Sequence, residues 1–137
     1  MYGSECWGMC ESDKRSLNTF HTGSLRRILG IHWPEILSNA ELYKRTNSEP
    51  LSQCIKNKRL RWLGHILRMK EKRIPKKALQ WTPQGRRKVG RPAVTWRSTI
   101  MKELAEMGMT WGEARVKAKD RLEWKSKVMT LCSTRSE

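Results

Sequence analysis

The side chains that could carry catalysis are few, and His65 is the first to consider. It lies in the stretch RLRWLGHILRM, whose apolar residues recur at helical spacing. On a helix, its neighbours three and four positions away are Arg61, Trp62, Arg68 and Met69. None of these is a metal ligand and two are cations, so a histidine that packs or hydrogen-bonds explains the pattern better than a zinc ligand or a general base.

Two cysteines raise the possibility of a metal site. Cys6 and Cys10 have C-x₃-C spacing, but His21 and His32 downstream do not form the second tight ligand pair of structural zinc sites. The acidic residues are scattered, and the chain has neither a glycine-rich phosphate loop nor a Ser/His/Asp arrangement that spacing could support. We therefore expect no catalytic residue, no metal, no cofactor and no small-molecule substrate. The cysteines are expected to be free thiols.

Net charge is the strongest signal in the composition. The chain of 137 residues carries 29 Lys and Arg against 13 Asp and Glu, a net charge of +16. Residues 1–50 are neutral overall, whereas residues 51–97 hold fifteen basic side chains and one acidic side chain, Glu71. A localised basic block favours a polyanionic partner, nucleic acid or an anionic membrane surface, over a general role in solubility. No apolar run is long enough to span a membrane, and the N-terminus does not resemble a signal peptide.

Helix and turn signals account for almost the whole chain. Apolar spacing predicts helices over 13–29, 39–46, 50–69, 94–107 and 110–132, the last continuous or restarting at Asp120. Gly30 and Gly108 are placed to end helices, and Ser38 and Thr110 to begin them. The one hint of a strand is near Tyr2–Trp7. Residues 71–93 contain three prolines and two glycines, which predicts an irregular basic arm.

These patterns predict an all-α chain. We expect a small helical domain over 1–70, the arm over 71–93, a second short helical part over 94–132 and a tail over 133–137. Gly64 is expected to permit a close approach of another backbone, and the stripe that includes Leu63 and Ile66 to pack on the helix around Leu25–Leu29. Trp62, Trp96, Trp111 and Trp124 lie on apolar faces and are expected to pack in the core.

The candidate nucleic-acid-binding residues come from the basic block. The segment GRRKVGRP resembles a minor-groove arm, but valine replaces one of the two arginines of an AT-hook, which favours phosphate contact over A·T readout. Trp81 is the aromatic residue best placed to stack on a base. The alternative is a solvated charged loop. The candidates are Arg59, Arg61, Arg68, Lys76, Lys77, Trp81, Arg86, Arg87, Lys88, Arg91 and Arg97.

Several stretches, in this order, resemble the C-terminal part of non-LTR (LINE-type) retrotransposon reverse transcriptases. They are YGSECW (2–7), LRRILGI (25–31), RLRWLGHILRM (59–69), IPKKALQW (74–81), GRRKVGRP (85–92) with Trp96, TWGEA (110–114) and DRLEW (120–124). The resemblance implies a thumb and post-thumb region that holds template RNA or target DNA. The catalytic Asp-Asp motif of these polymerases is absent, so we expect a truncated copy that is not an enzyme on its own.

Other functions stay open at this point. The amphipathic helices 50–69 and 94–107 could be an interaction module that packs on a missing polymerase domain. Tryptophan-rich stripes could instead lie on an anionic membrane surface, although we expect no membrane partner. The chain could also be a degenerate copy without function. The basic runs at 76–77 and 86–88 are compatible with a nuclear location but too short to define a localisation signal.

Overall fold

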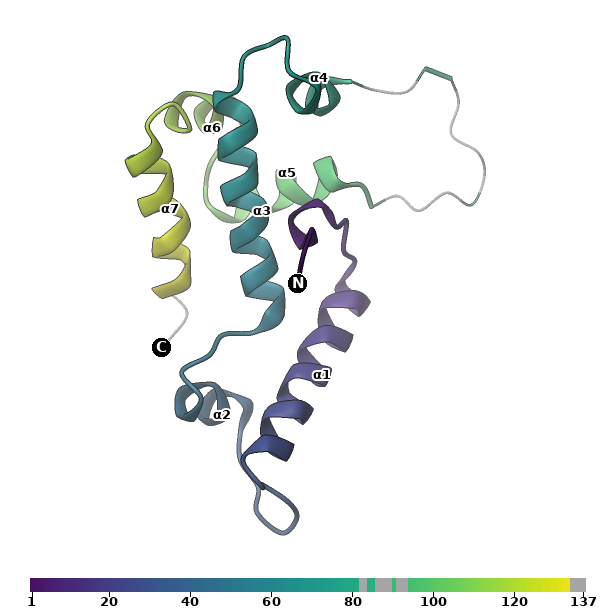
Figure 1. Cartoon of the computed structure of the whole chain (residues 1–137), viewed down its shortest axis with the longest axis vertical. Coiled ribbons are helices and arrows are strands. Elements are labelled where there is room, and N and C mark those ends of the chain that lie inside the picture. The colour runs from purple at the N-terminus through teal and green to yellow at the C-terminus, as the bar shows by residue number, and fades with distance from the viewer. Residues whose placement is uncertain (82–83, 86–89, 91–93, 134–137) are drawn as a thin grey trace. The chain divides into compact units, whose positions relative to one another are not determined.

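The computed structural model describes residues 1–81, 84–85, 90 and 94–133, and over these ranges it is all-α, with no strand (Figure 1). A short 3-10 helix, η1, covers Ser4–Cys6, where the sequence hinted at a strand. The α-helices are α1 (Glu11–Ile28), α2 (Asn39–Arg45), α3 (Leu51–Arg68), α4 (Ile74–Gln80), α5 (Trp96–Glu106), α6 (Trp111–Lys117) and α7 (Arg121–Ser133).

Helix ends follow the predicted capping residues. The Ser38 hydroxyl accepts a hydrogen bond from the Glu41 backbone N–H at the start of α2. Thr110 and Glu113 form a reciprocal capping box at the start of α6. Asp120 accepts from two backbone N–H groups in the first turn of α7, so a new helix begins there. Gly108, with φ of 63°, follows α5 in the left-handed conformation that glycine adopts most easily.

The chain divides into two compact units. Unit 1 comprises Met1–Gly8 and Lys56–Glu137, and unit 2 comprises Met9–Ile55. This grouping differs from the expected boundary at residue 70. The apolar stripe of α3 explains the difference, because from Leu60 onward it packs with side chains from the C-terminal helices.

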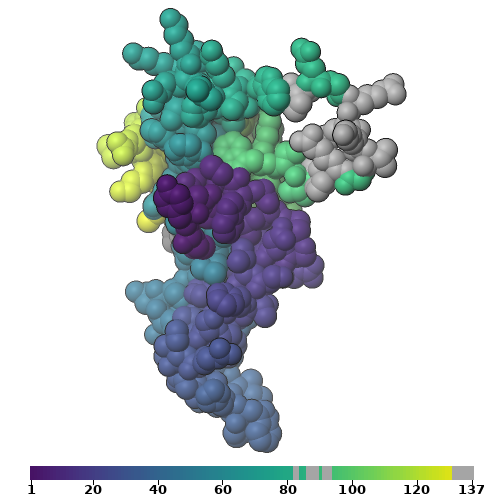
Figure 2. Space-filling view, turned by 45° about the vertical axis from the view of Figure 1, so that its right-hand side comes forward, coloured from purple at the N-terminus to yellow at the C-terminus, as the bar shows by residue number. Residues whose placement is uncertain are grey.

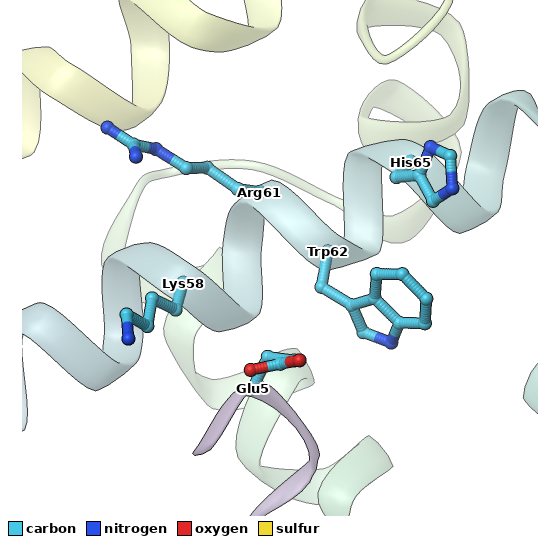
Figure 3. A pocket seen from close by; sticks show the side chains of 5 residues that line it. All are labelled: Glu5, Lys58, Arg61, Trp62 and His65. Atoms are coloured by element: carbon cyan, nitrogen blue, oxygen red, sulfur yellow. The ribbon is translucent and has the colours of Figure 1, made fainter. Parts of the chain in front are cut away.

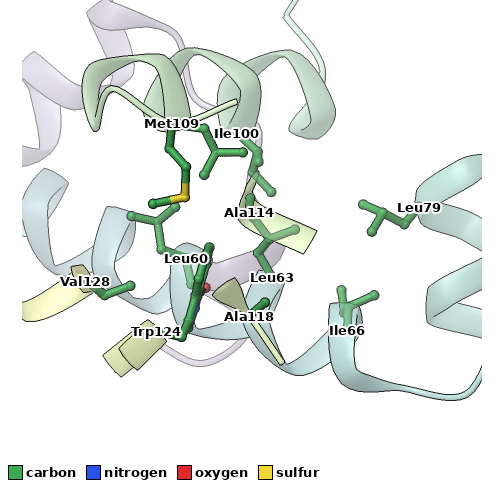
Figure 4. Close-up of a cluster of buried hydrophobic side chains, with 11 residues drawn as sticks. Leu60, Leu63, Ile66, Leu79, Ile100, Met109, Ala114, Ala118, Trp124 and Val128 are labelled. Atoms are coloured by element: carbon green, nitrogen blue, oxygen red, sulfur yellow. Dashed lines mark hydrogen bonds between the residues drawn. The ribbon is translucent and has the colours of Figure 1, made fainter. Parts of the chain in front are cut away.

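Unit 1 has a continuous hydrophobic core (Figure 4). Its buried members come from α3 to α7 and the turn before α6: Leu60, Leu63, Ile66, Leu79, Ile100, Leu104, Met109, Ala114, Ala118, Trp124 and Val128. The tryptophans at 62, 96 and 111 are partly buried against this cluster, as their helical spacing predicted. Leu63 and Ile66 pack on the C-terminal helices, so the prediction that they pack on the helix around 25–29 is wrong. Ile28 is 80% exposed.

Gly64 makes room for a side chain rather than for a backbone. A Cβ at position 64 would lie 2.5 Å from Cδ1 and 2.9 Å from Cε2 of Trp124, and nearer still to Nε1. The Trp124 indole is 2% exposed, and its Nε1–H donates to the Leu60 carbonyl oxygen at 2.9 Å. The glycine in the middle of α3 therefore creates the space in which α7 anchors its indole against α3.

Unit 2 is built from α1, α2 and the first turn of α3. Asn18 on α1 clamps Ser52: its Nδ2 donates to the serine hydroxyl at 2.9 Å, and its Oδ1 accepts from the serine backbone N–H at 3.1 Å. Arg26 donates to the Leu37 carbonyl at 2.9 Å and to Asn39 Oδ1 at 2.7 Å. The Arg26 contacts fix the connection between α1 and α2, and the Asn18 contacts tie α1 to the start of α3.

The arm expected over 71–93 is helical in part. Residues 74–80 form α4, with Pro75 in its first turn, where proline needs no backbone donor. Leu79 enters the core of unit 1 and is 7% exposed. Inside a helix this proline would break it, but in the first turn it begins one, and the apolar Leu79 supplies the burial that holds α4 in place.

Candidate nucleic-acid interface

Two of the predicted phosphate-binding cations are buried. Arg59 is 1% exposed, forms an ion pair with the buried carboxylate of Glu103, and donates from Nη2 to the Trp7 carbonyl at 3.0 Å. Lys76 is 4% exposed, and its ammonium group donates to the Leu67 carbonyl at 2.6 Å. Both side chains serve the internal structure of unit 1. The expectation that they face a phosphate backbone is wrong for this structure, because solvent does not reach them.

Arg61 and Arg68 are exposed but engaged at one end. Arg68 donates from Nη1 to the Ala118 carbonyl at 2.8 Å. Its partial burial and the neighbouring positive charge of Arg121 lower its pKa. Arg61 donates from Nη2 to the Met129 sulfur at 3.3 Å. Both guanidinium groups retain further N–H groups that could donate hydrogen bonds to a phosphate oxygen.

Lys77, Trp81 and Arg97 remain at the surface. The Trp81 ring follows α4 and is 69% exposed, so its face is open for stacking. The Arg97 guanidinium lies over the Trp111 ring, 6.0 Å from the centroid, and this contact orients it at the start of α5. The other four predicted residues, Arg86, Arg87, Lys88 and Arg91, lie outside the residues that the structure describes.

Three further exposed cations stand between the predicted ones. Lys70, Lys72 and Arg73 lie in the turn from α3 to α4. With Arg68 and Lys77 they form what we call the α3–α4 cationic surface. The segment that carries them is open on the face shown in Figure 2, where it is coloured teal. The sequence run KEKR at 70–73 is the local signal for this surface, although the glycine- and proline-rich segment downstream carries the more familiar motif.

The carboxylates of unit 1 are largely engaged in local structure. Glu103 pairs with Arg59, Glu106 pairs with Lys56 at 2.6 Å, and Glu71 lies 3.7 Å from the Lys76 ammonium. Glu113 and Asp120 cap helices. Among the described residues, none of these carboxylates forms an ion pair with the five cations of the α3–α4 cationic surface. Its positive charge is therefore left to solvent and to any anionic partner.

Over the described part of the chain, no three His, Cys, Asp or Glu side chains come together in a way that could hold a metal ion. Cys6, Cys10 and Cys54 take part in no disulfide bond. The described helices include none long and apolar enough to cross a membrane.

The comparisons with known proteins are sparse. No protein-family model and no solved structure matches the chain. It is 29% identical, over 136 residues, to a protein of Caenorhabditis elegans described as an uncharacterized transposon-derived protein. The match covers 90% of this chain and 47% of that protein, so the chain spans about half the length of this relative.

Proposed function

We propose that this chain descends from a transposable element and binds RNA or DNA with little sequence preference. In this proposal it corresponds to the thumb and post-thumb portion of a non-LTR reverse transcriptase and has no polymerase activity of its own. The transposon-derived relative supports the origin. The resemblance in YGSECW, RLRWLGHILRM, GRRKVGRP and TWGEA supports the finer assignment.

The observation that carries the binding proposal is the α3–α4 cationic surface. Five exposed cations occur within ten residues, while the one acidic residue among them, Glu71, faces the buried Lys76. A polyanion bound there would release its condensed counterions, which is the main source of affinity in sequence-independent binding.

Salt dependence of binding tests the proposal. Contact with about six phosphates of a duplex predicts that affinity falls roughly a thousandfold between 50 and 200 mM salt. Fluorescence anisotropy with a short RNA, a DNA duplex and an RNA–DNA hybrid would measure this. Binding that does not change with salt, or an absence of binding by a chain whose circular dichroism is helical, would reject the proposal.

Charge-neutral variants locate the surface. Lys72→Gln combined with Lys77→Gln should lower affinity for every sequence alike and reduce the slope of log K against log salt by about two, one for each phosphate that is no longer neutralised. The matched control removes two exposed cations from the neutral N-terminal region, Arg27→Gln with Lys44→Gln. An equal decrease in the control pair would mean that net charge, not this surface, determines binding.

An interaction function has one specific observation in its favour, and it lies in unit 2. Phe20, Trp33 and Ile36 are 70%, 89% and 90% exposed, respectively. Exposed apolar side chains mark a surface that binds another protein where they form a contiguous patch. The helices whose sequence pattern allowed this role, α3 and α5, bury their apolar faces in the core of unit 1. Size-exclusion chromatography of the wild type against Phe20→Ser would detect self-association through these residues.

A further inference from the structure

One hollow in unit 1 combines aromatic, cationic and acidic side chains. It has a volume of about 280 Å³ and is lined by Glu5, Lys58, Arg61, Trp62 and His65 (Figure 3). Four of these residues lie on α3 at positions i, i+3, i+4 and i+7, so helical geometry brings them to one side. Glu5 comes from η1, and Figure 3 shows its carboxylate beside α3, between the side chains of Lys58 and Trp62.

The walls of the hollow are held in place before any ligand binds. The Trp96 indole N–H donates to the Glu5 carbonyl at 2.7 Å, which fixes η1 at the edge of the core. Lys58 Nζ donates to the Met1 carbonyl at 3.1 Å. The Trp62 side chain is half-buried against the core, and the His65 ring rests against it with ring centroids 5.3 Å apart. Prior order of this kind lowers the entropy cost of binding.

The chemistry of the hollow fits an unpaired nucleotide. An indole offers a face on which a base can stack, and neighbouring cations can pair with the phosphates on either side. A carboxylate accepts hydrogen bonds from the N–H groups on the Watson–Crick edge of a base. Guanine presents two adjacent donors there, whereas uracil presents one donor between two carbonyl oxygens, which a carboxylate repels. A base in a duplex has this edge occupied by its partner.

We propose that this hollow holds one unpaired base of a bound strand, stacked on Trp62 with its Watson–Crick edge toward Glu5, and that it prefers guanine to uracil. Lys58 and Arg61 contact the adjoining phosphates. The inference rests on the nucleic-acid binding proposed above and adds a single-strand site to a surface that otherwise reads only the backbone.

The test compares single strands with duplex. Fluorescein-labelled octamers of uridine, with or without one central guanosine, are titrated by anisotropy beside an RNA duplex. Trp62→Leu keeps apolar bulk against the core but removes the aromatic face. It should weaken guanosine-octamer binding five- to a hundredfold, roughly the range of one base–aromatic stack. Duplex binding should stay unchanged. Glu5→Gln should abolish the preference for guanosine over uridine.

Two controls keep the result interpretable. Trp33→Leu removes an exposed indole from unit 2, which does not line the hollow, and should leave the single-strand to duplex ratio at its wild-type value. If circular dichroism shows that Trp62→Leu does not fold, Glu5→Gln and His65→Ala, the latter at an exposed residue, replace it in the binding test. Folded variants that bind both octamers as the wild type does would overturn the hollow as a base site, even while salt-steep binding of the wild type upholds the proposed function. Failure of the wild type to bind any of these strands would overturn both.

Discussion

Replacement of Gly64 by alanine should have two opposite effects on the free energy of unfolding, and the structure allows us to compare them. In a helix interior, alanine is favoured over glycine by about 1 kcal/mol. The new methyl group, however, would overlap the Trp124 indole, whose buried position and hydrogen bond to Leu60 leave it no room to yield. Overpacking typically costs about 1–3 kcal/mol, and a displaced indole would also weaken its hydrogen bond, worth about 1 kcal/mol. We expect a net loss of stability of about 1–3 kcal/mol.

Urea denaturation of four variants measures this balance. Gly112→Ala on α6 is the control, because its new methyl would meet no atom within 4 Å. It should be neutral or should raise stability by up to about 1 kcal/mol. In the background of Trp124→Leu, which opens the space, Gly64→Ala should become neutral or stabilising. An additive double-mutant cycle, or a gain in stability from Gly64→Ala in the wild-type background, would show that the Trp124 indole does not need a glycine at position 64.

Two other predictions concern buried and capping charges. Glu103→Ala leaves Arg59 in the core without its carboxylate partner and should lower the free energy of unfolding, measured in urea, by about 3–5 kcal/mol. Glu103→Leu combined with Arg59→Met should be nearly neutral. A smaller loss for the single variant would mean that water reaches the guanidinium group. Hydrogen bonds from the Thr110 backbone N–H and then its hydroxyl lower the pKa of Glu113 from 4.5, and those from the Cys10 thiol and then its backbone N–H lower that of Asp13 from 3.8. The hydrogen bonds of both caps therefore stabilise the fold fully at pH values above these ordinary pKa values. This stabilisation is lost as the pH falls through the lower pKa values of the folded protein. Glu113→Gln should make the melting temperature fall less steeply as the pH is lowered. An unchanged pH dependence would show that the Glu113 cap does not contribute to it.

The helices of this chain were predictable because their signals are local. Ser38, Thr110 and Asp120 each cap a helix through side-chain oxygens that reach backbone groups two or three residues away. Apolar spacing identified the stripe of α3 for the same reason. The partner of that stripe could not be predicted, since Leu63 packs in a cluster with residues far downstream, and only the three-dimensional packing decides between two amphipathic helices of similar character.

The candidate site shows the same division. Charge counting defined the basic block, but it gave Arg59 the same weight as Lys77. Burial separates them: Arg59 lies in the core opposite Glu103, a residue 44 positions away that no local pattern connects to it. The hollow at Trp62 was also beyond sequence reasoning, because Glu5 reaches α3 only through the fold of unit 1.

The engagement of carboxylates in caps and internal pairs has a further consequence for unit 1. Its surface cations repel one another with few acidic neighbours to offset them, and such self-repulsion weakens a compact state. A polyanion bound as proposed would reduce that repulsion and favour the folded chain. At a concentration one hundred times its dissociation constant, a ligand of the folded state adds about 2.7 kcal/mol. The thermal stability of this protein should therefore depend on the polyanions present. It should be lowest in dilute buffer, and RNA, DNA or heparin should raise it whatever their sequence.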